Sequence, residues 1–379
     1  MNSLGPLRPE PAVLPPVRTD PPAVRLDPLS SEPSCIVERL QGWHLPHLDD
    51  PAFLPLHPLL QRNLLLSVPR GLASALGRRQ SMGSLVLVAR EKGPGSKPTI
   101  LGLIVARPLN RRGSCWEVQH LRLALAAAEL PSSPARGHTA SSLLREAIQQ
   151  APGAVSWIAS ASSLDHTRLA LLRENGFQPQ RTERLWRWSI GDAAALASLP
   201  APLQLRPLHR RNAPLLWHLE QATCPAPLRQ VLDRRIDDLL ERSGGHGWLL
   251  IDPDRNEAVA GARWIADHPG GGHQVELSVH PGWNHLLGSA TEVLLRRLAP
   301  KGDQLWLLSD TDDGARQQWL AQLGAEEHGD VVLMARSLWR RQDAPAVRGA
   351  AQRISAVLEQ LQPRLQPRRR SVPTPLVRP

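Results

Sequence analysis

The segment from His273 to Ala299 constrains the fold most, because it combines a strand, a stop and a helix in one short stretch. Polar and apolar residues alternate over residues 274–279, and this period of two is typical of a strand. Pro281 and Gly282 end the strand. A helix then begins at Gly288 and Ser289, with its apolar residues on one face. A helix that starts with small residues offers free backbone amides, which favour an anion such as a pyrophosphate.

Two motifs in this segment resemble the GCN5-related N-acetyltransferases, the GNAT superfamily. Val279-His280-Pro281 is similar to the Val-x-Pro end of the family's central strand, and Gly288-Ser289-Ala290 is similar to the end of its phosphate-binding loop. His285 departs from the family, which usually has Gln or Arg at that position. The resemblance implies an α/β (α+β) fold in which a mixed, mostly antiparallel sheet is flanked by helices. It also implies acetyl-CoA as co-substrate.

The residues after this segment continue the same pattern. Residues 304–309 are predicted to form the next strand and residues 312–324 a helix, while residues 331–339 supply the closing strand. The run of Gly residues at 270–272 is followed by a strand rather than a helix, so we interpret it as a hairpin turn.

The first part of the chain shows the same order of elements. Two β-rich runs, residues 84–90 and 99–107, are predicted to form an antiparallel hairpin, and helical stretches are expected between residues 36 and 75. The elements expected after the hairpin are a strand at 116–123, a helix that follows residues 136–141, a strand at 155–159, and a helix at 165–175 that ends at Gly176.

The sequence therefore predicts two tandem GNAT-like domains, each large enough to bury a core of its own. The expected segments are a Pro-rich disordered stretch at 1–33, an N-terminal domain at 34–190, a linker at 191–202, a C-terminal domain at 203–342, and a basic tail at 343–379.

The resemblance places the acetyl-CoA phosphates at both helix starts. In the first copy the expected contacts are Arg136, Gly137, Thr139, Ala140 and Ser141, and in the second they are Val279, Asn284, His285, Leu287, Gly288 and Ser289. Backbone amides do most of this binding, so side-chain substitutions are compatible with it. The alternative is an ordinary helix N-terminus in a degenerate copy.

Acetyl transfer to an amine also needs a proton acceptor. Glu276 lies on the central strand, where the family often has a carboxylate, and aligning residues 118–123 with 274–279 places His120 at the same position, with Glu117 nearby. Either residue type suits a general base, although a polar residue on a half-buried strand is also simply solvated. The family's tyrosine acid is missing: its positions hold Leu172 and Leu320, and the chain has no Tyr.

Composition narrows the remaining function classes. Cys35, Cys115 and Cys224 are scattered singly, which favours a reducing cytoplasm over a disulfide framework or a Cys-based metal site. No metal is expected at His44, His47 and Asp49, whose spacing and neighbouring prolines indicate a turn. No apolar run has a membrane span's length of about 18 residues, and no signal pattern occurs at the N-terminus.

The net charge of +10 is concentrated in the tail, where residues 341–379 carry eight Arg against two acidic residues. Arg greatly outnumbers Lys, which indicates a GC-rich bacterial genome. Nucleic-acid binding, if any, is expected to be non-specific.

Three hypotheses follow from the sequence. The first is an N-acetyltransferase that acts on a small-molecule or protein amine. The second is a non-catalytic tandem module that binds acyl-CoA or a protein partner. The third is a nucleic-acid-associated protein that uses its basic tail.

Overall fold

The computed structural model describes residues 35–75, 83–91, 99–125, 134–191, 199–242, 246–299 and 302–337. The Pro-rich segment at 1–33 and the basic tail at 343–379 lie outside the described residues. We call residues 35–191 the first half and residues 199–337 the second half.

Twelve strands form one continuous sheet, in the order β1-β2-β3-β4-β5-β12-β6-β11-β10-β9-β8-β7. The first half contains β1 (Cys35–Arg39), β2 (Leu85–Glu91), β3 (Ile100–Pro108), β4 (Cys115–Leu123), β5 (Ser156–Ser162) and β6 (Gln178–Ser189). The second half contains β7 (Gln204–Pro207), β8 (Gly247–Asp252), β9 (Glu257–Asp267), β10 (His273–Val279), β11 (Gln304–Asp310) and β12 (Glu326–Ser337). Among these strands, β4–β5 and β10–β11 pair in parallel and the other neighbours are antiparallel, which confirms the mixed, mostly antiparallel sheet.

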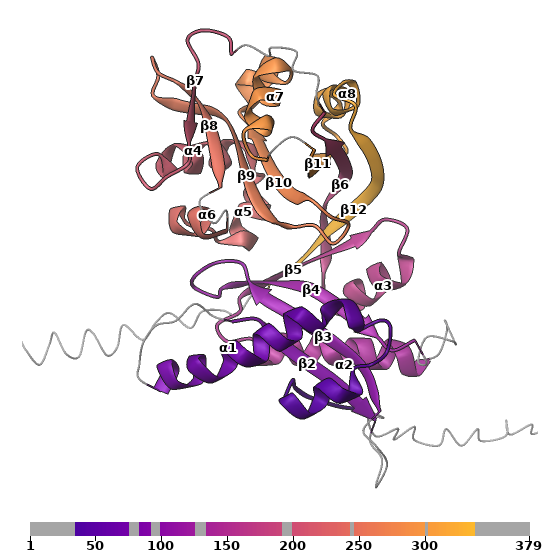
Figure 1. Ribbon diagram of the computed structural model, residues 1–379. Coiled ribbons are helices and arrows are strands. Elements are labelled where there is room, and N and C mark those ends of the chain that lie inside the picture. Colours follow the sequence, from indigo (N-terminus) through magenta and orange to yellow (C-terminus); the bar gives the residue numbers. More distant parts are fainter. Residues whose placement is uncertain are drawn as a thin grey trace, which may run out of the picture. The chain divides into compact units, whose positions relative to one another are not determined.

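The helices also follow one order in both halves. The first half has the short 3-10 helices η1 (Gly42–His47) and η2 (Leu54–Leu56), then α1 (His57–Ala75), α2 (Pro134–Gln150) and α3 (His166–Glu174). The second half has α4 (Ala213–Thr223), α5 (Ala226–Leu232), α6 (Ile236–Arg242), the 3-10 helix η3 (Pro281–Leu286), α7 (Ser289–Arg296) and α8 (Gly314–Gln322). In each half, one helix joins the two parallel strands and another follows them (Figure 1).

The closing strands are exchanged between the halves. β6 of the first half pairs with β11 of the second half, and β12 of the second half pairs with β5 of the first half. β6 and β12 also pair with each other at the centre of the sheet. The strand pairing thus crosses the sequence boundaries that were expected between the two domains.

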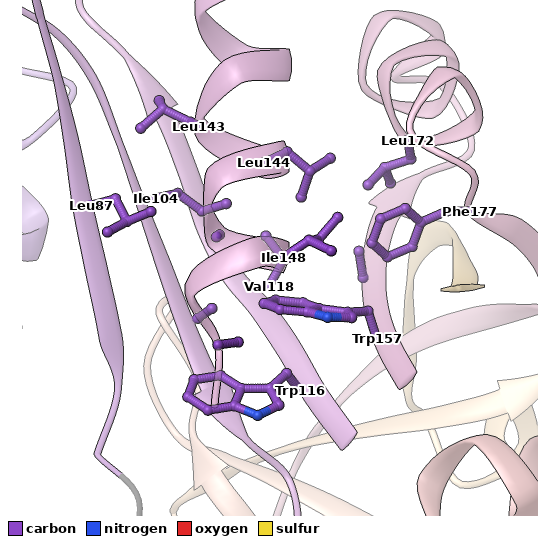
Figure 2. Packing of buried hydrophobic residues seen from close by; sticks show 14 of the residues in the cluster. Leu87, Ile104, Trp116, Val118, Leu143, Leu144, Ile148, Trp157, Leu172 and Phe177 are labelled. Carbon is purple, nitrogen blue, oxygen red and sulfur yellow. The ribbon is translucent and has the colours of Figure 1, made fainter. Parts of the chain in front are cut away.

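Helices cover both faces of the sheet in each half. In the first half, α2 and α3 pack on one face around Trp116 and Trp157, as Figure 2 shows, and the other face carries the residues around η1, η2 and the start of α1. Met334 of β12 is buried in this first-half core, so the burial of a second-half side chain stabilises the first half.

The second half repeats this layering. α7 and α8 pack on one face, around Leu277 and Leu320, and α4 and α6 pack on the other, around Leu216 and Leu239. α5 instead packs on β5 and β12: Leu228 and Leu232 contact Ile158 and Leu333.

Several elements agree with the sequence predictions and one does not. The first hairpin is formed by β2 and β3, and the helix before Gly176 ends there, with Gly176 at a φ of 82°. The glycine run is the turn between β9 and β10, with Gly271 and Gly272 at positive φ. The helical stretches expected before residue 75 lie in α1. The strand β1 was not predicted, because its short CIVER sequence gains its backbone partners from β2.

Candidate functional site

Each pair of parallel strands is hydrogen-bonded at one end and diverges at the other. β10 and β11 pair over three residues and separate after Val275 and Leu307, although both strands continue. We call residues 276–279 and 308–310 the C-terminal fork. In the first half, β4 and β5 separate after Val118 and Ala159, and residues 119–123 with 160–162 form the N-terminal fork. Backbone groups at a fork lack a partner strand, so they are suited to a ligand that carries amides.

His120 and Glu276 occupy equivalent register positions in the two forks. His120 lies opposite Val105 on β3, and Glu276 lies opposite Arg263 on β9. His120 is two residues after the last parallel pair of β4, whereas Glu276 is one residue after that of β10. The extra residue is the irregularity between Val105 and Ala106 in the β3–β4 pairing.

The expected phosphate loop of the first half is helical. α2 already begins at Pro134, so Arg136, Gly137, Thr139, Ala140 and Ser141 lie within the helix rather than before it. A proline suits the first position of a helix because it lacks the N–H that would remain unpaired there. Thr139 and Ala140 are buried, and the amides this far into a helix are used by its own hydrogen bonds. The helix start therefore lies nearer the N-terminus than the sequence predicted, and Thr139, Ala140 and Ser141 lie beyond its first turn.

In the second half, a turn at Gly288 precedes the helix α7. Gly288 caps α7 with a φ of 152° and a ψ of −137°, a backbone conformation that favours glycine. Its N–H donates to Thr291 Oγ1 at 3.0 Å, and the same hydroxyl donates to the Leu286 carbonyl. Ser289 is exposed at the first helical position. The turn is therefore fixed by one threonine.

The other residues expected in this loop surround the same turn. Asn284 and His285 are exposed on η3, and the Asn284 carbonyl accepts from the Leu287 N–H at 3.0 Å. Val279 is buried in the core and contributes only its backbone to the fork. A pocket of about 310 Å³ lies beside the turn. It is lined by Pro200, Ala201, Pro202, Leu203, Trp283, His285, Leu286, Ser289 and Ala290.

Glu276 belongs to a network of ion pairs. Its Oε2 accepts from Arg263 Nη2 at 2.7 Å, and its Oε1 accepts from Arg234 Nη1 at 3.3 Å. Both arginines also reach Glu220 of α4, at 2.5 Å from Arg263 and 3.6 Å from Arg234. Burial lowers the pKa of Arg234, but the Glu276 and Glu220 carboxylates raise it above its ordinary value overall. Both Glu276 oxygens are thus already engaged by cations.

The exchanged strand brings a second carboxyl group to the C-terminal fork. Glu183 of β6 lies opposite Asp310, the last residue of β11, and pairs with Arg181 at 2.6 Å. Burial raises the pKa of Glu183; Arg181 opposes the shift, and the carboxylates of Glu276 and Asp310 add to it. A carboxyl group with a raised pKa is a general-base candidate. Glu183 could not be found from the sequence, because it lies on the closing strand of the other half.

In the N-terminal fork, His120 is partly buried on β4. Burial lowers the pKa of His120, and the charges of Arg122 and Arg168 lower it further while Glu117 opposes them. The ring is therefore neutral at pH 7, the form that accepts a proton. Glu117 pairs with Arg107 at 2.8 Å, which engages it in a cross-strand ion pair.

An arginine occupies the same place on the helix beside each fork. Asp165 caps α3 by accepting from the Arg168 N–H, and Asp313 caps α8 by accepting from the Arg316 N–H. Arg316 Nη1 also donates to the Leu277 carbonyl at 3.1 Å, inside the C-terminal fork. One turn further along each helix, Leu172 and Leu320 are buried in the cores, so no acid replaces the missing tyrosine there.

Within the described residues, no group of three His, Cys, Asp or Glu side chains has the arrangement of a metal site. His44 is buried and hydrogen-bonds Glu38 at 3.1 Å, a structural role. None of the described helices is both long and apolar enough to cross a membrane.

Both halves thus place three antiparallel strands before a diverging parallel pair, with a helix between the parallel strands and another before the closing strand. Each half therefore has a mixed, mostly antiparallel sheet flanked by helices. This is the fold that the sequence resemblance implied.

The chain is similar to several solved structures. An N-acetyltransferase of the GCN5-related type from Sphaerobacter thermophilus has a TM-score of 0.48 at 12% identity, covering 80% of this chain and 96% of that chain. A tandem GNAT protein from the clavulanic acid biosynthesis pathway has a TM-score of 0.44 at 15% identity, covering 69% and 85%. A Drosophila protein has a TM-score of 0.45 at 12% identity, covering 80% and 98%. No protein-family model and no curated protein matches the sequence.

Proposed function

We propose that this chain is an acetyltransferase that moves the acetyl group of acetyl-CoA to an amine, with its active site at the C-terminal fork. The observation that carries the proposal is the divergence of β10 and β11 directly before a glycine-capped helix. The fork offers backbone groups to the amide-bearing arm of acetyl-CoA. The helix start beside it offers backbone amides to the phosphates of the same cofactor.

The cofactor end of the site is assigned to the turn before α7. The phosphates bind at Gly288 and Ser289, where the helix dipole favours negative charge. The exposed Asn284 and His285 are close enough in sequence to add side-chain contacts. An arm anchored by its phosphates at the open end of the fork directs its thioester toward the closed end, near Leu277. The unpaired cysteines of the sequence fit a reducing cytoplasm, where we place the reaction.

The acceptor end is assigned to the face of the sheet that carries Glu276, Glu183 and Asp310. Carboxylates on this face attract an ammonium group, and one of them takes a proton as the amine attacks the thioester carbonyl. Glu276 was predicted for this role, directly or through water. Its two arginine partners leave Glu183 as the less engaged carboxyl group, so we assign proton transfer to the pair and expect Glu183 to contribute more. The acceptor is an amine of a small molecule or a protein.

A second candidate function is a non-catalytic module that binds acyl-CoA or a protein partner. Two observations favour it: Arg316 occupies the Leu277 carbonyl, and arginines occupy both Glu276 oxygens. In this function the ion network stabilises the fold, and none of its carboxyl groups transfers a proton to or from a substrate.

Turnover of acetyl-CoA by the full chain with a panel of primary amines separates the two functions. We expect release of free thiol, lowered about 10²-fold by Glu183→Gln, the usual scale for loss of a general base. Because the pKa of Glu183 is raised, the rate should increase with pH as this carboxyl group loses its proton.

Glu276→Gln should lower the turnover less than Glu183→Gln does. Glu146→Gln, on α2 and far from the fork in sequence, serves as the control. Binding of acetyl-CoA without turnover of any amine would favour the non-catalytic module.

A further inference from the structure

A largely buried cation lies inside the C-terminal fork, near carboxyl groups of β6 and β11. Arg316 comes from the first turn of α8, and only 16% of its side chain is exposed. Its Nη1 donates to the Leu277 carbonyl at 3.1 Å, and its Nε lies 3.2 Å from Asp313 Oδ2. Leu277 belongs to β10 beyond the last parallel pair, so the guanidinium reaches into the space where the strands separate.

The same arrangement occurs in the first half. Arg168 holds the matching position on α3, three residues after the capping Asp165, as Arg316 is three residues after Asp313. Its Nε is buried and has no hydrogen-bond partner among the described residues. Arg168 is also close enough to His120 to lower the pKa of that ring. A cation beside the fork is therefore a repeated feature of this chain.

We propose that Arg316 stabilises the coenzyme A thiolate as it leaves the thioester. This inference rests on the proposed function. In that reaction the amine nitrogen forms a bond to the acetyl carbon, the carbon–sulfur bond breaks, and its electron pair goes to sulfur. The proton lost by the amine goes to the carboxyl pair, and the thiolate later takes a proton from water. A guanidinium is always charged and donates no proton, so its contribution is electrostatic.

The position of Arg316 suits this task for two reasons. A partly buried charge acts on its neighbours more strongly than one in water. Its partners leave donor capacity, because a guanidinium has five N–H groups and only a carbonyl and one carboxylate are placed on it by the contacts above. Electrostatic stabilisation by Arg316 would also let the thiolate leave without an acid at Leu320, the position where the family has its tyrosine.

Coenzyme A and desulfo-coenzyme A provide a test that needs no knowledge of the acceptor. Both are titrated into the full chain by calorimetry between about pH 6 and pH 9, a range that spans the ordinary thiol pKa of about 8.5. A fork that prefers the thiolate lowers the pKa of the bound thiol. Affinity for coenzyme A then rises with pH until the free thiol is itself ionised, whereas desulfo-coenzyme A has no thiol to titrate.

We expect the ratio of the two affinities to rise about tenfold or more across this range, the effect of a nearby opposite charge on a titrating group. Arg316→Gln should flatten the rise, and Arg316→Lys should keep most of it. The other charged groups near Arg316 are Asp313 on its own helix, Asp310 on β11, and Arg181 and Glu183 on β6. Glu276 on β10 acts in turn on Glu183. Their titration affects both ligands, so it cancels in the ratio.

The outcomes separate this inference from the proposed function. A ratio that does not change with pH in the unaltered chain would overturn the role of Arg316, while acetyl-CoA binding would stand. A rise that survives Arg316→Gln would also overturn it, because another group would be responsible. The exposed Arg297→Gln is the control and should keep the full rise. If the unaltered chain binds neither ligand, the proposed function fails and the inference fails with it.

Discussion

The N-terminal and C-terminal forks are built from the same order of strands and helices, but the chain enters the next helix in two different ways. After β4 the helix starts with Pro134 and runs straight through Gly137, whereas after β10 a tight turn at Gly288 precedes α7. The polar residues also differ, since His120 faces Val105 while Glu276 faces Arg263. The same element order is therefore compatible with two different backbone conformations at the helix start.

The largest effect is expected from the ion network that only the second half has at this register position. Arg263→Met takes one cation from the buried Glu220 carboxylate, and Arg234 remains 3.6 Å from it. Removing one partner of a buried ion pair costs about 3–5 kcal/mol. Chemical denaturation of the full chain measures the loss. Arg173→Met, an exposed change on α3, is the control. A loss below about 1 kcal/mol, the range of exposed ion pairs, would mean that water screens the network.

The strand exchange makes a prediction of nearly the same size. Met334 lies on β12 of the second half but is fully buried in the core of the first half. Met334→Ala should cost about 2–5 kcal/mol, and hydrogen exchange should show the loss of protection in β4 and β5. Leu320→Ala, a change on α8 in the core of the second half, should instead reduce the protection of the second half. Loss of protection around α8 in both variants would contradict the exchange.

The two glycines at the helix starts should respond in opposite directions. Gly288→Ala has free space around the new Cβ but an unfavourable φ, so it should destabilise the chain by about 1–3 kcal/mol. Gly137→Ala also has free space and lies inside α2, so it should stabilise by about 0.5–1 kcal/mol. Thermal unfolding of both variants gives the comparison. Stabilisation by Gly288→Ala would show that the turn is not fixed.

The smallest expected effect is the pH dependence that comes from His120. Because its folded-state pKa is lowered, the unfolded chain binds the proton more readily. Stability should therefore fall as the pH drops below the unfolded value of about 6.5, and His120→Gln should remove part of that fall. Unfolding curves at several pH values test it. The second half has Glu276 at this position and so has no such ring. If the stability of His120→Gln depends on pH as steeply as that of the unaltered chain, the two forks do not differ in this respect.

Much of the fold follows from local sequence pattern. The alternation in β10, the β2–β3 hairpin and the glycine stops at Gly176 and Gly271 are set by neighbouring residues, and all were predicted. The exchange of β6 and β12 was not, because a strand's own sequence does not specify which strand will lie beside it.

The candidate site shows the same limit. Gly288 and the equivalence of His120 and Glu276 could be inferred from motif and alignment. Glu183 could not, because it reaches the fork only through the exchange. Gly137 suggested a loop, but a helix tolerates one glycine when a proline sets its start.

Calorimetric titration of the full chain with acetyl-CoA tests the central claim most directly. We expect micromolar binding, on the order of −8 kcal/mol, which Gly288→Leu weakens strongly and Gly137→Leu leaves unchanged. The Gly137 variant controls for a bulky side chain at the other helix start. No binding at millimolar acetyl-CoA, or a loss caused by Gly137→Leu and not by Gly288→Leu, would contradict the assignment of the active site to the C-terminal fork.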